Sequence, residues 1–332
     1  MSRKKNSILF YGIYSLSGIL LLISVLVTGT YGLRKENVEV YEAADALQPE
    51  MDKMQFPGFK LEDYPVRFYD GDSDYVITGT KQPDGTKLKK ESPVFQTYVG
   101  TITKVDGSWQ VVVPVLEQFS QFMDLMADAG TLMEGGLAAG YEKEAYGQEE
   151  HAATIWHEAF HAYQMTNYEE AVDGLVKEEL PEETGMEGII TSKVDQDSSQ
   201  VSGIKKELEH LKKIYATEEP VEKKKQIAQY LELESSRKSR LSDTARWVEQ
   251  YYETVEGTAC FVEGYAYGVQ KGAKAFEKHY IQNCEYSRGS GKYYYSGMLK
   301  CCILDQVCPG WEKSYDFTCT LDDLLEQYTN SR

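Results

Sequence analysis

The chain has 332 residues, of which 42% are hydrophobic and 27% are charged, so its composition is that of a globular protein and excludes a disordered chain. Its 35 basic and 53 acidic residues give a formal net charge of −18 at pH 7. Because binding to a phosphate backbone needs a basic surface, this charge excludes nucleic acid as an expected partner.

An uncharged apolar run over residues 8–28 follows three basic residues at positions 3–5. Since about 20 apolar residues suffice for a helix to cross a bilayer, we expect residues 1–30 to form a cytoplasmic tip and a single transmembrane anchor in the cell membrane. The basic cluster predicts a cytoplasmic N-terminus and an extracytoplasmic remainder. A cleaved signal peptide is the alternative, although the run is long for one and residues 28–30 match a cleavage site poorly.

The next part of the chain changes from polar to strand-like patterns. Residues 31–63 are mixed and polar, and are predicted to be a juxtamembrane linker. Short apolar–polar alternations over 64–115 predict a β-rich subdomain. Within it, Asp106-Gly107 predicts a hairpin turn between a strand over 94–103 and another over 109–113.

Beyond residue 115 the apolar residues recur at helical spacing. This periodicity predicts helices over 116–126, 148–166 and 203–216, a long charged helical stretch over 221–267, and an amphipathic helix at the C-terminus. We therefore predict an α+β fold class, with an N-terminal transmembrane helix, a small β-rich region and a mostly helical domain over 116–332.

The six cysteines all lie in the last third of the chain, from Cys260 onward. An even number of cysteines outside the cytoplasm permits disulfides, so one or two bridges beside buried thiols are expected. The sequence contains no Asn-x-Ser/Thr glycosylation site, which favours a bacterial surface protein over a eukaryotic secretory one.

The strongest chemical signal is the pentapeptide His157-Glu158-Ala159-Phe160-His161, which lies within a predicted helix. Positions i and i+4 share one face of a helix, so both imidazoles can reach a single Zn²⁺. Glu158 would lie beside that metal and could accept a proton from a zinc-bound water as the general base.

A catalytic zinc site needs a third protein ligand and one open position. Because no further histidine follows at motif spacing, we expect a carboxylate from the helical segment that contains Glu253, Glu256 and Glu263. Glu256 precedes the small residues of 257–259, which would let its helix press against the histidine helix, so it is the preferred ligand. Glu253 and Glu263 remain alternative ligands, or hydrogen-bond partners of the zinc-binding histidines.

The motif HEAFH followed downstream by Glu256-Gly-Thr-Ala resembles the gluzincin group of zinc metallopeptidases. The resemblance implies a zincin-like catalytic domain with one Zn²⁺ per chain, His157, His161 and Glu256 as ligands, and Glu158 as the general base. It also implies hydrolysis of a peptide or protein substrate, here by a membrane-anchored, extracytoplasmic hydrolase. Two departures are a longer gap between the two motifs and Cys260, which stands where some members carry an aspartate.

A peptidase also needs a hydrogen-bond donor for the oxyanion of its tetrahedral intermediate. In enzymes of the resembling group this donor is often a tyrosine or histidine, and the candidates are Tyr265, Tyr293, Tyr294 and Tyr295. Two alternatives to an enzyme stay open. One is a zinc-binding surface sensor or binding domain without turnover, and the other is a structural surface protein in which HEAFH is accidental.

Overall fold

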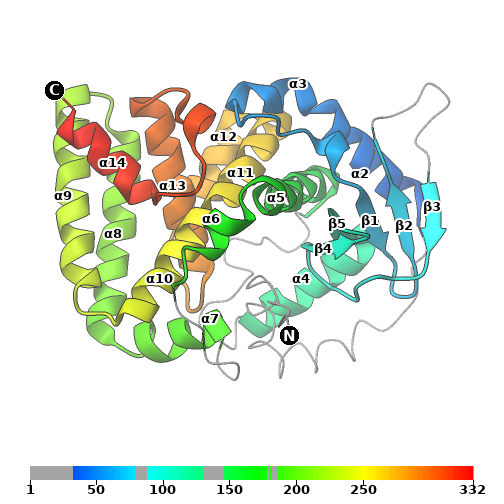
Figure 1. Ribbon diagram of the computed structural model, residues 1–332, viewed down its shortest axis with the longest axis horizontal. Helices are drawn as coiled ribbons and strands as arrows, with labels where there is room; N and C mark the ends of the chain where they lie inside the picture. Colours follow the sequence, from blue (N-terminus) through cyan, green and yellow to red (C-terminus); the bar gives the residue numbers. More distant parts are fainter. Residues whose placement is uncertain (1–32, 80–87, 131–145, 178–179, 181–184, 332) are drawn as a thin grey trace.

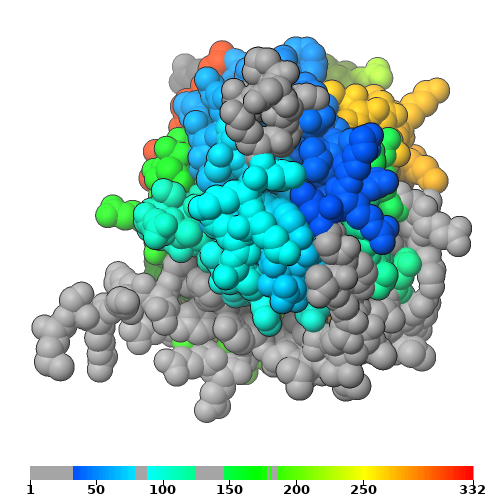
Figure 2. Space-filling model, turned by 90° about the vertical axis from the view of Figure 1, so that its right-hand side faces the viewer, coloured from blue at the N-terminus to red at the C-terminus, as the bar shows by residue number. Residues whose placement is uncertain are grey.

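The computed structural model describes residues 33–79, 88–130, 146–177, 180 and 185–331, and they are mostly helical with one small sheet. The strands are β1 (Val66–Tyr69), β2 (Asp74–Ile77), β3 (Leu88–Glu91), β4 (Thr101–Val105) and β5 (Ser108–Pro114). Their order in the sheet is β3-β2-β1-β5-β4, in which only β1 and β5 run parallel. Figure 2 shows the side of the molecule where the N-terminal helices, in dark blue, and the cyan region that includes the edge strand β3 reach the surface.

Most helices up to residue 194 are short, and the longer ones are α2, α4 and α5. They are α2 (Lys35–Ala46), α3 (Gln48–Met51), the 3-10 turns η3 (Asp52–Met54) and η4 (Leu61–Asp63), α4 (Leu116–Gly130), α5 (Gln148–Asn167), α6 (Glu169–Asp173), α7 (Gly185–Ile189) and the π-helical η5 (Ile190–Val194).

The later helices form the rest of the molecule. They are α8 (Ser198–Ala216), α9 (Pro220–Lys238), α10 (Asp243–Tyr251), the π-helical η6 (Tyr252–Glu256), α11 (Gly257–Lys271), α12 (Ala273–Phe276), the π-helical η7 (Glu277–Gln282), α13 (Gly291–Val307), the 3-10 turn η8 (Trp311–Ser314) and α14 (Leu321–Asn330).

The helix α5 lies at the centre of the fold. It packs against α2 and β5 on one side and against α11 on the other, and Figure 1 shows it between the sheet and the paired helices α8 and α9. Almost every residue from His151 to Met165 is buried, not only the apolar stripe. A helix that is covered all round holds its side chains in fixed positions, which suits a site built on it.

The strand predictions agree with the sheet in part. Strands of the described residues fall between Val66 and Pro114, and β4 and β5 form a hairpin at Asp106-Gly107. Both turn residues have positive φ, 50° and 88°, as a two-residue primed turn requires. The strand predicted over 94–103 is wrong over 94–100, because pairing with β5 begins only at Thr101.

The predicted linker over 31–63 is also wrong, since much of it forms helices that are part of the core. Val40, Tyr41 and Ala44 of α2 are buried, and the Ala44 carbonyl accepts a hydrogen bond from the Trp156 indole at 3.1 Å. Further along, Phe59 packs edge-on against Trp156 with ring centroids 5.4 Å apart. The N-terminal segment therefore covers one side of α5.

The predicted fold class and membrane location need correction. The predicted span over 8–28 lies outside the described residues, and within the described part no helix is long and apolar enough to cross a membrane. The longest helices there, α5, α8 and α9, all carry ionisable side chains along their length. The described chain is a mostly helical protein with one five-stranded sheet, and the prediction of a single-pass membrane protein is contradicted by its helices.

The cysteine prediction is corrected as well. All six cysteines lie in the described part, and all six are free thiols. Four of them, Cys260, Cys284, Cys301 and Cys302, are buried, where they act as small apolar side chains of the helical core.

Two glycines allow α13 to cross the continuous helix of α10, η6 and α11 at close range. A Cβ added to Gly297 would lie 2.1 Å from the carbonyl oxygen of Glu253 and 2.7 Å from the Cα of Gly257. The small residue Gly257 was expected to face the histidine helix, but it faces α13 instead. Its neighbour Thr258 contacts α5 through Gln164.

Replacing Gly297 by alanine should therefore destabilise the protein, because backbone atoms cannot move aside as a flexible side chain can. We expect Gly297→Ala to lower the free energy of unfolding by about 1–3 kcal/mol, the range for overpacked cores. The matched control is Gly291→Ala in the same helix, where the added Cβ meets only the Ser287 hydroxyl at 3.2 Å. Denaturant unfolding measures both, and equal stabilities of the two variants would contradict the prediction.

Candidate metal centre

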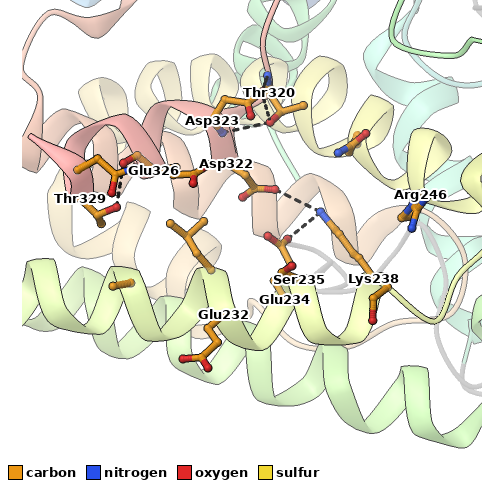
Figure 3. A pocket seen from close by; sticks show the side chains of 15 residues that line it. Glu232, Glu234, Ser235, Lys238, Arg246, Thr320, Asp322, Asp323, Glu326 and Thr329 are labelled. Atoms are coloured by element: carbon orange, nitrogen blue, oxygen red, sulfur yellow. Dashed lines mark hydrogen bonds and ion pairs between the residues drawn. The ribbon is translucent and has the colours of Figure 1, made fainter.

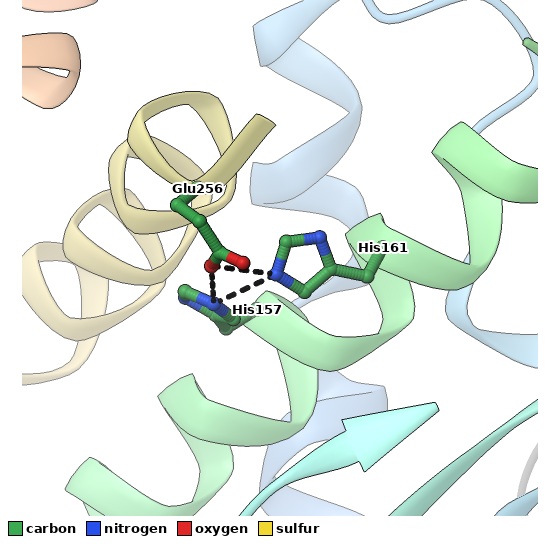
Figure 4. A group of neighbouring side chains, drawn as sticks. All are labelled: His157, His161 and Glu256. Atoms are coloured by element: carbon green, nitrogen blue, oxygen red, sulfur yellow. Dashed lines mark hydrogen bonds and ion pairs between the residues drawn. The ribbon is translucent and has the colours of Figure 1, made fainter. Parts of the chain in front are cut away.

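Three side chains from two helices meet beside the middle of α5. His157 and His161 extend from one face of α5, and Glu256, which is the last residue of η6, points toward them (Figure 4). The Nε2 atom of His161 lies 3.1 Å from Nε2 of His157 and 3.1 Å from Oε2 of Glu256. The remaining distance, from Nε2 of His157 to Oε2 of Glu256, is 3.5 Å.

The hydrogen bonds of Gln164 decide which nitrogen of His161 carries a proton. The Gln164 amide nitrogen donates to the Val255 carbonyl at 3.0 Å and to the Thr258 hydroxyl at 2.9 Å. A carbonyl can only accept, so the Gln164 oxygen is the atom that faces Nδ1 of His161, at 2.7 Å. Nδ1 must then donate, and Nε2 of the neutral ring presents a lone pair.

A carboxylate orients His157 in the same way. Oε2 of Glu263 accepts a hydrogen bond from Nδ1 of His157 at 2.9 Å, while the Tyr280 hydroxyl donates to Oε1 at 3.0 Å. Burial alone would raise the pKa of Glu263, but the hydrogen bond with His157 lowers it, so the group is an ionised acceptor. Nε2 of neutral His157 therefore also presents a lone pair toward the shared point.

When both rings are neutral, two imidazole lone pairs and a carboxylate oxygen converge, an arrangement that favours a cation between them. Ligand atoms at ~2.0–2.1 Å from a tetrahedral zinc would be about 3.3–3.4 Å apart, close to the separations of 3.1, 3.1 and 3.5 Å found here. The residues His157, His161 and Glu256 form a group that could hold a metal ion.

The electrostatics of the group also favour a cation. Burial alone would lower the pKa of His157 and His161, but the carboxylate of Glu256 raises both, with Glu263 adding to the effect on His157. Burial would raise the pKa of Glu256, yet the two histidines hold it well below its ordinary value. A positive charge at the imidazoles, whether from protons or from a metal, is therefore stabilised.

Glu158 lies next to this group and is almost fully buried, with 8% of its surface exposed. Burial raises the pKa of its carboxyl group. Gly100, one residue before β4, lies against it, and a Cβ added there would be 2.4 Å from Oε1 of Glu158. The Glu158 carboxylate thus occupies the space that a Cβ at residue 100 would need, a contact that sequence reasoning missed because no local pattern marks Gly100.

The tyrosine candidates separate clearly. Tyr294 stacks on His157, with ring centroids 6.4 Å apart and an angle of 24° between the planes, and a hydrogen bond with Glu256 contributes, after burial, to its raised pKa. Tyr293 donates its hydroxyl proton to Glu249. Burial raises the pKa of Tyr265, which has Lys53 nearby, and also the pKa of Tyr295, which has Cys260 and Glu263 nearby. Tyr294 is the candidate that reaches the metal group.

The sequence leaves Glu253 as an alternative ligand or a partner of the histidines, but its contacts lie elsewhere. Its carboxylate accepts a hydrogen bond from Ser296 at 2.7 Å and pairs with Lys238 and Lys300, each at 3.0 Å. Of the two suggested partners, Glu253 and Glu263, it is Glu263 that forms a hydrogen bond with a histidine of the group.

Glu234, Glu253 and Asp322 form a second group with metal-like spacing. Lys238 reaches between Glu234 on α9 and Asp322 on α14, at the wall of a cavity of about 540 Å³ (Figure 3). Because Lys238 and Lys300 already bind these carboxylates, the second group carries its own cations and is not a metal site.

The chain was compared with protein-family models, curated proteins and solved structures, and none of the three comparisons finds a match. The assignment of this centre therefore rests on the geometry and chemistry of its own residues.

His151, one and a half turns before His157, is a structural residue. Its Nε2 lies 3.0 Å from the Pro114 carbonyl and its Nδ1 lies 3.0 Å from the Tyr146 hydroxyl. Burial lowers the pKa of His151 to about 4, so the folded protein keeps this imidazole neutral while the unfolded chain protonates it near pH 6.5. The stability that depends on the neutral ring is complete above pH 6.5 and is lost as the pH falls toward about 4.

His151→Gln should therefore reduce the acid sensitivity of folding. We expect the free energy of unfolding of the wild type to fall more steeply between pH 6.5 and 4.5 than that of the variant, because glutamine does not titrate. Denaturant unfolding at several pH values, with a chelator present in all samples, measures this difference. Parallel pH profiles of the two proteins would contradict the prediction.

Proposed function

We propose that this protein is a zinc-dependent peptidase with its catalytic centre at His157, His161 and Glu256. The observation that carries the proposal is the convergence of two imidazole lone pairs and one carboxylate oxygen, with Glu158 directly beside them. Two histidines and one carboxylate are a ligand set of hydrolytic zinc enzymes, and three protein ligands leave a position open for water or substrate.

The buried residues around the centre would divide the chemistry between them. Zinc bound there would supply a Lewis acid and a water of lowered pKa. Glu158 would take the proton of the attacking water and deliver it to the leaving amine. Its burial raises its pKa, which makes it better able to hold that proton. The Tyr294 hydroxyl would donate a hydrogen bond to the developing oxyanion.

The end of the sheet supports a peptide as the substrate. In the described part of the chain β4 is the last strand on its side of the sheet, and it begins one residue after Gly100, which lies against Glu158. An extended peptide can add to such an edge through its main chain. A peptide paired with β4 would then pass the carboxylate of Glu158.

The resemblance to the gluzincins is part of the proposal. The separation of 95 residues between His161 and Glu256 was the main departure from that group. The intervening chain contains α8 and α9, which pack against each other, followed by α10, which leads directly into η6. A helical insertion of this kind is compatible with Glu256 as the third ligand.

Variants of the proposed ligands should lose the metal. We expect the wild type to retain one zinc per chain after dialysis, whereas His157→Ala, His161→Ala and Glu256→Gln retain little. Glu263→Gln should keep zinc with about 10–100-fold weaker affinity, since it only orients His157. Elemental analysis and chelator competition measure this. Equal zinc content in the wild type and all three ligand variants would overturn the proposed centre.

Variants of the proposed reacting groups should lose turnover but keep the metal. We expect Glu158→Gln to retain zinc and to lose at least about 100-fold in peptide hydrolysis, because general-base catalysis contributes about 10²–10⁴-fold. Tyr294→Phe should lose rate mainly in kcat, as expected for a group that acts in the transition state. Hydrolysis of a mixed peptide library, followed by mass spectrometry, measures the activity. Zinc binding without any hydrolysis by the wild type would favour the non-catalytic binding domain.

A further inference from the structure

The π-helical segment η6 connects the metal centre to the second, lysine-containing group of carboxylates. Glu253 and Glu256 both belong to η6, but Glu256 faces the histidines of α5 while Glu253 faces α9 and α13. A π turn is wider than an α turn, so it changes the direction in which the following side chains point. The position of Glu256 therefore depends on keeping this turn wide.

The helix α13 holds the wide turn on its outer side. Ser296 and Lys300 bind the carboxylate of Glu253, at 2.7 and 3.0 Å, and Gly297 lies against the Glu253 carbonyl. Tyr294, one turn away on the same helix, reaches Glu256 itself. One face of α13 thus contacts both the side chains and the backbone of η6.

The charges that hold Glu253 are costly to bury. Lys300 is fully shielded from solvent, and Lys238 and Glu253 are nearly so. Apolar residues of similar size would often pack the same space at least as stably. A buried ion pair instead fixes the direction of its two partners, because either charge left alone would be strongly unfavourable.

We propose that Lys300 and Glu253 are positioning residues for Glu256. Their ion pair holds η6 in the π-helical form, and this form places the Glu256 carboxylate against His157 and His161. The inference rests on the proposed metal centre and extends it to two residues that do not touch the metal group themselves.

The experiment measures zinc affinity of the folded, full-length apoprotein by competition with a chromophoric chelator. We expect Lys300→Met to weaken zinc binding by about 10–100-fold, as for other groups that orient a ligand, in samples whose circular dichroism shows a folded protein. The control is Lys292→Met, also on α13, whose ammonium is equally buried and pairs with Asp195 at 2.8 Å. It should bind zinc like the wild type.

A second variant covers the case in which Lys300→Met does not fold. Glu253→Gln keeps the volume and the Ser296 contact but removes the charge, and it should weaken zinc binding in the same range. Amide hydrogen exchange should be faster at residues 252–257 in this variant than in the wild type. The Lys292→Met control should leave exchange there unchanged.

The outcomes separate the two proposals. A wild type that does not bind zinc would overturn the metal centre. A wild type that binds zinc, with folded Lys300→Met or Glu253→Gln binding equally tightly, would overturn the positioning role alone. Equal weakening by Lys300→Met and Lys292→Met would also overturn it, because the loss would then follow general destabilisation of α13.

Discussion

The chemistry of the centre depends on two hydrogen bonds that face away from it. Gln164 and Glu263 each accept a hydrogen bond from the Nδ1 atom of a histidine, and this leaves both Nε2 atoms facing Glu256. With the acceptors exchanged for donors, the same two rings would present N–H groups and could not bind a cation. The affinity of the site for a cation thus depends on Gln164 and Glu263, which contact the two histidines but are not members of the metal group themselves.

These hydrogen bonds can be maintained because α5 is enclosed by protein. Water is excluded from most of its surface, so Gln164 has to satisfy its amide on the chain itself and does so on Val255 and Thr258 of the neighbouring helix. The same two bonds tie α5 to the segment that carries Glu256. Packing, tautomer and ligand position are therefore linked through one buried glutamine.

In the described part of the chain, two groups of three side chains have the spacing of metal ligands, and they differ in how their charge is balanced. Glu234, Glu253 and Asp322 are paired with Lys238 and Lys300, whose ammonium groups lie among the three carboxylates and offset two of their negative charges. Around His157, His161 and Glu256 the described residues supply no lysine or arginine ion pair. In a chain of net charge −18, the first arrangement suits a structural role, and the second suits a cation taken from solution.

Local patterns in the sequence determined the features that depend on short-range geometry. Two histidines four residues apart must share a face of any helix, and Asp106-Gly107 matches the positive φ angles of a tight hairpin. Which carboxylate meets the histidines was decided only by tertiary structure. Glu253, Glu256 and Glu263 lie on one continuous helix, and the π turn at η6, held by α13 through Gly297, sends the first toward the lysines and the second toward α5. A side chain's direction across a helix interface depends on packing between distant segments, which periodicity along one helix does not contain.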